Sequence, residues 1–165
     1  FSSKLAILGD SNLSRISNTP VEVESIQTDS YPGAKLTHLH NILKTHNSTN
    51  QTPDTLILSI GINNKENKTT THRQNLRKLA TIASQKFPST QVCIPQVNYS
   101  ESLPEAQKQS LSAFNTIVRA LTDSHDNLCT IPPLTSEEFK TCPDNIHWTP
   151  ETANKMLAHW TKHLN

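Results

Sequence analysis

The segment KLAILGDSNLSRI (residues 4–16) contains the beginning of the fold and the first candidate for chemistry. A continuously apolar run ends in Gly9-Asp10-Ser11, and a pattern at helical spacing follows at once. Continuously apolar runs of this length are typical of buried strands in parallel sheets. Ser11 therefore stands where a buried strand meets a helix, and there it either caps the helix or acts as a nucleophile.

Short apolar runs and amphipathic stretches alternate along the rest of the chain. Their periodicity predicts strands over residues 4–9, 21–27, 54–61, 90–97 and 127–132. It predicts helices over residues 34–46 and 69–87, from the capping-box pair Ser102 and Glu105 onward, and from Thr149-Pro150-Glu151 to Leu164. Strands that alternate with helices form right-handed βαβ units, so we expect a parallel sheet covered by helices on both faces.

The composition fits one globular domain, residues 1–165, with a formal net charge of +1 and a mean hydropathy of −0.54. The charged residues are scattered, so we expect no nucleic-acid binding by this domain itself. Phe1 stands directly before strand-like sequence, without an initiator Met, a signal peptide or a transmembrane run, which suggests a domain cut from a longer protein. The odd number of cysteines argues against a disulfide framework. We therefore expect an intracellular, cytoplasmic location.

Glycine is rare in this chain, and each of the three glycines follows a predicted strand. Gly9 follows the first strand, Gly33 lies in the loop SYPGA after the second, and Gly61 ends the third in GINN. Glycine permits a positive φ or a close approach to the backbone. Ligands of parallel α/β sheets bind beyond the carboxyl ends of the strands. The three glycines thus indicate where a site is to be expected.

Residues with the chemistry of acyl transfer accompany these glycines. That reaction needs a nucleophile, a base, a group that orients the base, and donors for the oxyanion. Ser11 can be the nucleophile and His147 the base, with Asp144 three residues before the histidine to orient it. The backbone N–H groups of Ser11 and Gly33, with the side-chain amide of Asn63, can form the oxyanion hole.

Several other interpretations compete with this one. Ser11 taken alone is equally well explained as an N-cap. A metal site built from Cys142, Asp144 and His147 lacks the paired ligand spacings of zinc sites, so we expect no metal. A Gly-x-Ser-x-Gly elbow and a phosphate-binding Gly-rich loop are both absent from the sequence. The other seven histidines, His72 among them, are expected on solvated helix faces.

These blocks resemble the SGNH hydrolase superfamily, also called GDSL esterases and lipases. Its four marker residues match Ser11 in GDSN, Gly33 in YPGA, Asn63 in GINN and His147 in DNIHW, which together span residues 9–148. The resemblance implies a three-layer α/β/α, flavodoxin-like fold with a five-stranded parallel sheet, and Asp144 as the third member of the triad. One departure is Asn64, which replaces the usual aspartate of the third block and leaves the hydrogen bonds of that loop in question.

A narrower resemblance is to the esterase domain in the first open-reading-frame protein of certain vertebrate LINE retrotransposons. It implies that RNA binding and self-association belong to flanking regions. We expect a serine esterase without a cofactor that hydrolyses short-chain, acetyl-type esters, such as a small ester or an acetylated lipid, and that has a membrane-lipid surface as a candidate partner. Asn12, Ile62 and Tyr99 are the expected pocket residues. The rival is a catalytically decayed module that binds lipid or acylated ligands, and Asn64 alone favours it.

Overall fold

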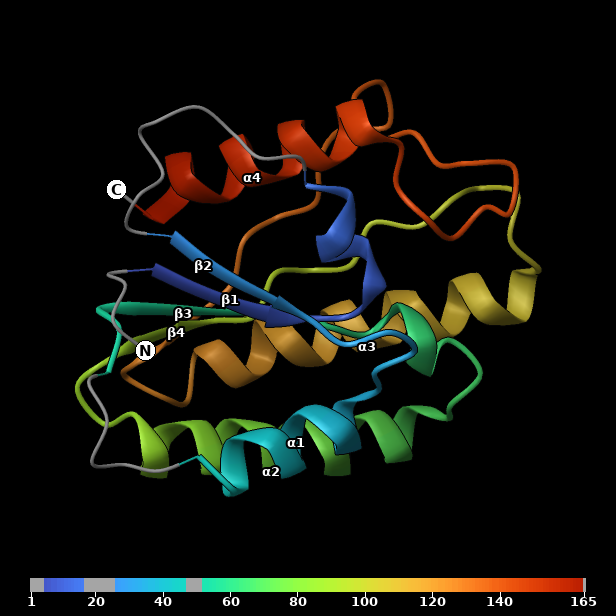
Figure 1. Ribbon diagram of the computed structural model, residues 1–165. Helices are drawn as coiled ribbons and strands as arrows, with labels where there is room; N and C mark the ends of the chain where they lie inside the picture. Colours follow the sequence, from blue (N-terminus) through green and yellow to red (C-terminus); the bar gives the residue numbers. More distant parts are fainter. Residues whose placement is uncertain (1–4, 17–25, 47–51, 165) are drawn as a thin grey trace.

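The computed structural model describes residues 5–16, 26–46 and 52–164, and these form one parallel sheet with helices on both faces (Figure 1). The strands are β1 (Leu5–Gly9), β2 (Ile26–Ser30), β3 (Thr55–Ser59), β4 (Gln91–Cys93) and β5 (Leu128–Cys129), in the order β2-β1-β3-β4-β5. The helices are α1 (Leu36–Lys44), α2 (Thr69–Lys86), α3 (Glu105–Thr122) and α4 (Pro150–Leu164), with short 3₁₀ turns η1 (Ser11–Arg15) and η3 (Ile62–Asn64). All four strand pairs are parallel.

The strand order explains why the helices form two layers. From β2 onward each connection moves in the same direction across the sheet, and right-handed crossovers then place α1, α2 and α3 on one face. Helix α4 lies on the opposite face, together with η1 (Figure 1). The predicted three-layer architecture with a five-stranded parallel sheet is confirmed. The chain runs from β1 outward to β2 and then returns past β1 to β3, so the carboxyl ends of β1 and β3 form the switch point where α/β folds place ligands.

Alternate residues of the central strands build a separate core on each face of the sheet. Leu56 and Leu58 of β3 pack toward α1, α2 and α3. Ile7 of β1 and Ile57 of β3 pack toward α4, where they meet Trp160. Burying one such aliphatic side chain stabilises a fold by about 1.5–3 kcal/mol. The two cores hold the strand ends, and the loops that follow them, in fixed positions.

The predicted strands are longer than the observed ones, and the second one is displaced. Of the predicted strand 21–27, residues 21–25 lie outside the described residues, and β2 continues to Ser30. Its last residues are Thr28, Asp29 and Ser30, and no residue of β2 is buried because β2 is an edge strand. The apolar periodicity of the sequence is therefore weak over the residues that form β2. The fourth strand ends before Pro95, although Ile94 and Gln96 still donate N–H groups to Cys129 and Ile131.

The predicted start of the third helix was wrong by two to three residues. Helix α3 begins at Glu105 with Pro104 at the N-cap, and Ser102 is exposed outside the helix. The physical reason is Pro104, because a proline disfavours helical backbone in the residue before it, here Leu103. The capping box between Ser102 and Glu105 is therefore not formed.

His72 corrects a second expectation, since it is buried on α2 instead of solvated. Its Nε2 lies 2.8 Å from the hydroxyl of Ser110 on α3, and that hydroxyl donates to the carbonyl of Asn67. The imidazole ring also meets Phe114 edge-on. His72 thus joins α2 to α3 inside the helical layer. Among the described helices, none is long and apolar enough to cross a membrane.

Candidate active site

In the turn after β1, the hydroxyl of Ser11 is not used to cap the following 3₁₀ helix. Asp10 is the N-cap of η1, and its carboxylate accepts the N–H of Asn12 at 3.0 Å. The capping role that the sequence left open for Ser11 is therefore filled by its neighbour. Gly9 is required just before this turn, because a Cβ at that position would lie 2.1 Å from the carbonyl oxygen of Ser59 on β3.

Ser11, His147 and Asp144 form a continuous chain of hydrogen bonds. The Oγ of Ser11 lies 3.1 Å from Nε2 of His147, and Nδ1 of His147 lies 2.5 Å from Oδ2 of Asp144. The other carboxylate oxygen of Asp144 accepts the backbone N–H groups of Ile146 and His147 at 2.9 and 3.0 Å. The bond to His147, helped by these two N–H groups, holds the pKa of Asp144 well below its usual range. Asp144 is thus an ionised group that orients the imidazole ring.

A tight turn allows the side chains of Asp144 and His147 to face each other, although the two residues are only three positions apart. Asn145 adopts a positive φ of 63°, a conformation that asparagine tolerates better than most residues. The N–H of Asn145 donates to the carbonyl of Cys142, and the N–H of Cys142 donates to the carbonyl of His147 at 2.7 Å. These bonds fold residues 142–147 back on themselves, so that the carboxylate and the imidazole face each other.

Asn12 links the turn that carries Ser11 to the loop that carries His147, the histidine loop. Its side-chain oxygen accepts the backbone N–H of Trp148 at 2.9 Å, and its amide nitrogen donates to the carbonyl of Ile146 at 3.4 Å. The residues on both sides of His147 are therefore held by the residue that follows Ser11. Asn12 is 2% exposed. Asn12 was expected only as a pocket residue, and the sequence carries no signal for this positioning role because the partners are backbone groups 134 and 136 residues away.

The loops after β2 and β3 carry Gly33 and Asn63, the other two residues expected in the oxyanion hole. Gly33 is exposed with a φ of 72°, and Asn63 lies in η3 directly after Gly61, whose φ is 130°. One N–H of the Asn63 amide donates to the carbonyl of Ala34 at 2.9 Å, which fixes the side chain and leaves its second N–H for another acceptor. Among the described residues, the backbone N–H groups of Ser11 and Gly33 donate to no other group. Three donors are thus available on the loops after β1, β2 and β3.

Asn64 stands where the resembled family usually has an aspartate, and its side chain still forms a hydrogen bond that holds this loop. It is 1% exposed, and its side-chain oxygen accepts the backbone N–H of Leu36 at 3.1 Å. An amide oxygen can accept an N–H as a carboxylate does. Together with the bond from Asn63 to Ala34, this contact joins η3 to the beginning of α1.

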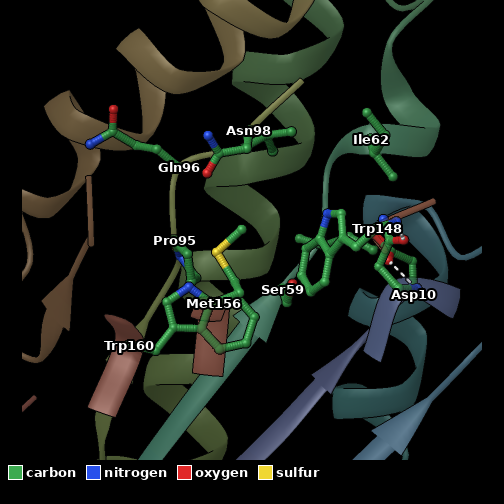
Figure 2. Close-up of a pocket in the computed structure, with 12 residues that line it drawn as sticks. Asp10, Ser59, Ile62, Pro95, Gln96, Asn98, Trp148, Met156 and Trp160 are labelled. Atoms are coloured by element: carbon green, nitrogen blue, oxygen red, sulfur yellow. Dashed lines mark hydrogen bonds between the residues drawn. The ribbon is translucent and has the colours of Figure 1, made fainter. Parts of the chain in front are cut away.

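A small cavity lies beside the turn that carries Ser11. It measures about 30 Å³, and Asp10, Asn12 and Ile62 are among the residues that line it. Figure 2 shows Trp148, Met156 and Trp160 gathered around the same space, with Ser59 at the strand end. Asp10 is 3% exposed, and this burial raises its pKa to about 6, against the opposing effects of the Asn12 N–H and of His147.

The three expected pocket residues fall in two places. Asn12 and Ile62 line the small cavity. Tyr99 lines a separate groove of about 550 Å³ between the loops after β4 and β5. Ile62 and Tyr99 nevertheless belong to one apolar cluster, together with Ile146. Within residues 5–16, 26–46 and 52–164, no three His, Cys, Asp or Glu side chains are arranged to hold a metal ion.

Several solved structures are similar to this chain in fold. No protein-family model matches the chain, and neither does any curated protein sequence. The solved structure of a lipase/acylhydrolase from Enterococcus faecalis is similar with a TM-score of 0.75 and 17% identity, over 98% of this chain and 95% of that one. A member of the lipolytic protein G-D-S-L family from Veillonella parvula DSM 2008 has a TM-score of 0.71 and 16% identity, over 96% of both chains.

A third similar structure is the C-terminal catalytic domain of peptidoglycan O-acetyltransferase A from Streptococcus pneumoniae. Its TM-score is 0.72 at 12% identity, over 99% of this chain and 95% of that one. At these identities the likeness concerns the fold, and it extends over almost the whole chain.

Proposed function

We propose that this protein is a serine esterase of the SGNH type, which hydrolyses short-chain carboxylic esters through Ser11, His147 and Asp144. The observation that carries the proposal is the unbroken chain of hydrogen bonds from the Ser11 hydroxyl through the imidazole to the Asp144 carboxylate. The lipase/acylhydrolase and the O-acetyltransferase domain with similar folds support it, because both are named for acyl-group chemistry.

The geometry supports a two-step mechanism. Ser11 Oγ attacks the ester carbonyl while Nε2 of His147 accepts its proton, and the proton then passes to the oxygen of the departing alcohol. This leaves an acyl group on Ser11. Water then attacks the acyl-enzyme, with His147 taking its proton, and the carboxylic acid departs as the proton returns to Ser11. Asp144 stays ionised throughout and stabilises the imidazolium.

The N–H groups of Ser11 and Gly33 and the second amide N–H of Asn63 are the proposed oxyanion donors. Each lies on a loop after a different one of the three neighbouring strands β2, β1 and β3. The Asn63 side chain is held in place by its bond to Ala34, so it needs no reorganisation when charge develops on the carbonyl oxygen.

A short acyl group fits the space near the nucleophile better than a long one. The cavity beside the turn, at about 30 Å³, has room for about two water molecules. Trp148, Met156 and Trp160 fill the region around it (Figure 2). An acetyl group is therefore the preferred acyl part in this proposal.

Substitution of the nucleophile tests the proposal. Ser11→Ala should abolish hydrolysis of p-nitrophenyl acetate and labelling by a fluorophosphonate probe, while far-UV circular dichroism and the melting temperature stay near those of the wild type. Ser112→Ala on the exposed side of α3 is the matched control and should retain both activities. Undiminished turnover in Ser11→Ala would refute the mechanism. A wild-type protein that neither turns over the ester nor reacts with the probe would favour the non-catalytic rival.

The rival module that binds acylated ligands without turnover rested on Asn64. Because Asn64 keeps a hydrogen bond to Leu36, that residue no longer favours the rival. The narrower resemblance to a retrotransposon esterase domain, its RNA-binding and self-associating flanks, and a lipid-surface partner stay predictions.

A further inference from the structure

A groove of about 550 Å³ lies between the loop after β4 and the loop after β5. Residues 97–102 form one wall and residues 133–141 the other. In Figure 1 both loops extend beyond the carboxyl ends of the strands, the first in yellow and the second in orange. The volume is within the range of small-molecule sites in proteins, which is about 300–1,000 Å³.

The groove is physically connected to the proposed catalytic residues. Tyr99 on its first wall packs in one apolar cluster with Ile62 and Ile146. Ile62 directly precedes Asn63, and Ile146 directly precedes His147. In addition, the hydroxyl of Ser100 donates to the side-chain oxygen of Asn145 at 3.4 Å. A molecule in the groove would therefore lie beside the histidine loop.

Two asparagine side chains hold the walls in place. The Asn98 side chain exchanges two hydrogen bonds with the backbone of Leu134, at 2.8 and 3.0 Å, and so links one loop to the other. The Asn115 side chain on α3 does the same with the backbone of Val97, at 2.7 and 3.0 Å. Because these amides use their polar atoms on the backbone, the groove is preformed by internal bonds and needs no ligand to shape it.

The remaining lining offers hydroxyl groups beside aromatic rings. Within the part of the chain that the structure describes, the side-chain hydroxyls of Tyr99, Ser102, Ser136 and Thr141 make no hydrogen bond to another protein group, and all four residues are exposed or half-buried. Phe139 adds a second ring. Hydroxyls that both donate and accept suit a ligand that carries hydroxyls of its own. Aromatic faces suit the C–H faces of a saturated ring, since they are apolar and flat.

We propose that this groove binds the alcohol part of the ester and that this alcohol is a polyhydroxylated, sugar-like ring. The inference rests on the proposed esterase function. A fatty chain is the poorer fit, because it would bury the hydroxyls of both walls and approach the charges of Glu101 and Lys140 without compensating for them. In hydrolysis the acyl group passes to Ser11, the proton held by His147 passes to the sugar oxygen, and the free sugar leaves the groove.

Binding can be measured without turnover. Ser11→Ala, titrated with a mixture of mono-O-acetylated methyl glucosides and followed by amide chemical shifts, should show saturable shifts at Tyr99, Ser136 and Thr141. Methyl glucoside without the acetyl group should shift the same amides more weakly. Shifts confined to residues outside the groove, or none at millimolar ligand, would overturn the proposal, even where p-nitrophenyl acetate is hydrolysed normally.

Kinetics of the active protein provide the second readout. Tyr99→Phe and Ser136→Ala should each lower kcat/KM for the acetylated glucosides relative to kcat/KM for ethyl acetate by about twofold to tenfold, the effect of losing one hydrogen bond. Ser112→Ala on α3 is the matched control and should leave this ratio unchanged. Equal losses on both esters, or p-nitrophenyl palmitate as the preferred substrate, would overturn the sugar assignment.

The two proposals can fail separately. Hydrolysis of ethyl acetate without binding of the sugar esters refutes the groove assignment and leaves the esterase intact. Saturable binding of the sugar esters to the Ser11→Ala protein, with no hydrolysis by the wild type, supports the groove as a sugar site and refutes the esterase.

Discussion

The side-chain oxygen of Asn12 accepts the backbone N–H of Trp148 at 2.9 Å, although the two residues are 136 positions apart. Asn12 follows the proposed nucleophile, and Trp148 follows the proposed base. The first and last blocks of the site are therefore joined by a buried hydrogen bond in addition to the bond between Ser11 and His147. The imidazole of His147 is therefore positioned in two ways. Asn12 holds the backbone beside His147, and the Asp144 carboxylate holds the ring itself.

Removing the Asn12 side chain should harm both stability and turnover. In Asn12→Ala the N–H of Trp148 is left buried without a partner, which costs about 1–3 kcal/mol in the free energy of unfolding. The histidine loop also loses its anchor, and we expect kcat for p-nitrophenyl acetate to fall by about tenfold or more, because small misplacements of catalytic groups are costly. Urea unfolding and steady-state kinetics measure the two effects. Lowered stability with unchanged kcat would show that the bond is merely structural.

Asn64 allows a similar test of the loop that carries Asn63. Asn64→Ala should lower the free energy of unfolding by about 1–3 kcal/mol, since the Leu36 N–H loses its buried acceptor. Asn64→Asp restores the residue usual in the resembled family and keeps an acceptor oxygen at the same position. We expect it to be more stable than Asn64→Ala in urea unfolding at pH 7. The opposite order would mean that the buried charge outweighs the restored bond.

The fold was largely predictable because the central strands are strongly apolar. Ile7 and Ile57 mark β1 and β3, where hydrophobic burial decides the structure and the periodicity reports it directly. The edge strand β2 was misplaced because none of its residues is buried and its last three residues are polar. His72 was assigned to solvent because its partner, the Ser110 hydroxyl, comes from another helix.

The same distinction applies to the site. Ser11, His147 and Asp144 could be identified from residue type and from their place after strands, and the structure brings the three together. The role of Asn12 in holding the histidine loop could not be identified, since its partners are backbone groups that any residue would supply. The interactions that the sequence hid are long-range bonds to the main chain, and these depend on the tertiary arrangement.

Two glycines with positive φ should respond differently to the same substitution. Gly61→Ala would place a Cβ 2.7 Å from Phe114 and 2.8 Å from Val97, in addition to the strain of a φ near 130°. Gly33→Ala meets no atom within 4 Å, so it carries only the strain of its φ, of the order of 1 kcal/mol. We expect Gly61→Ala to lower the free energy of unfolding by about 1–3 kcal/mol more than Gly33→Ala. Urea unfolding of the pair measures the difference, and equal losses would contradict the packing around Gly61.

Asp10 should make the stability of the protein depend on pH. Its pKa rises from 3.8 to about 6 on folding, so the stability associated with this group is fully present below pH 3.8 and is lost as the pH rises through 6. The loss at neutral pH is of the order of 3 kcal/mol. Asp10→Asn keeps an oxygen for the Asn12 N–H but carries no charge, and we expect it to be more stable than the wild type at pH 8, with the difference shrinking toward pH 4. Asp123→Asn, at the exposed end of α3, is the control. Urea unfolding across this pH range measures the effect. A difference in the free energy of unfolding between Asp10→Asn and the wild type that does not change with pH would show that ionisation of Asp10 does not destabilise the folded protein.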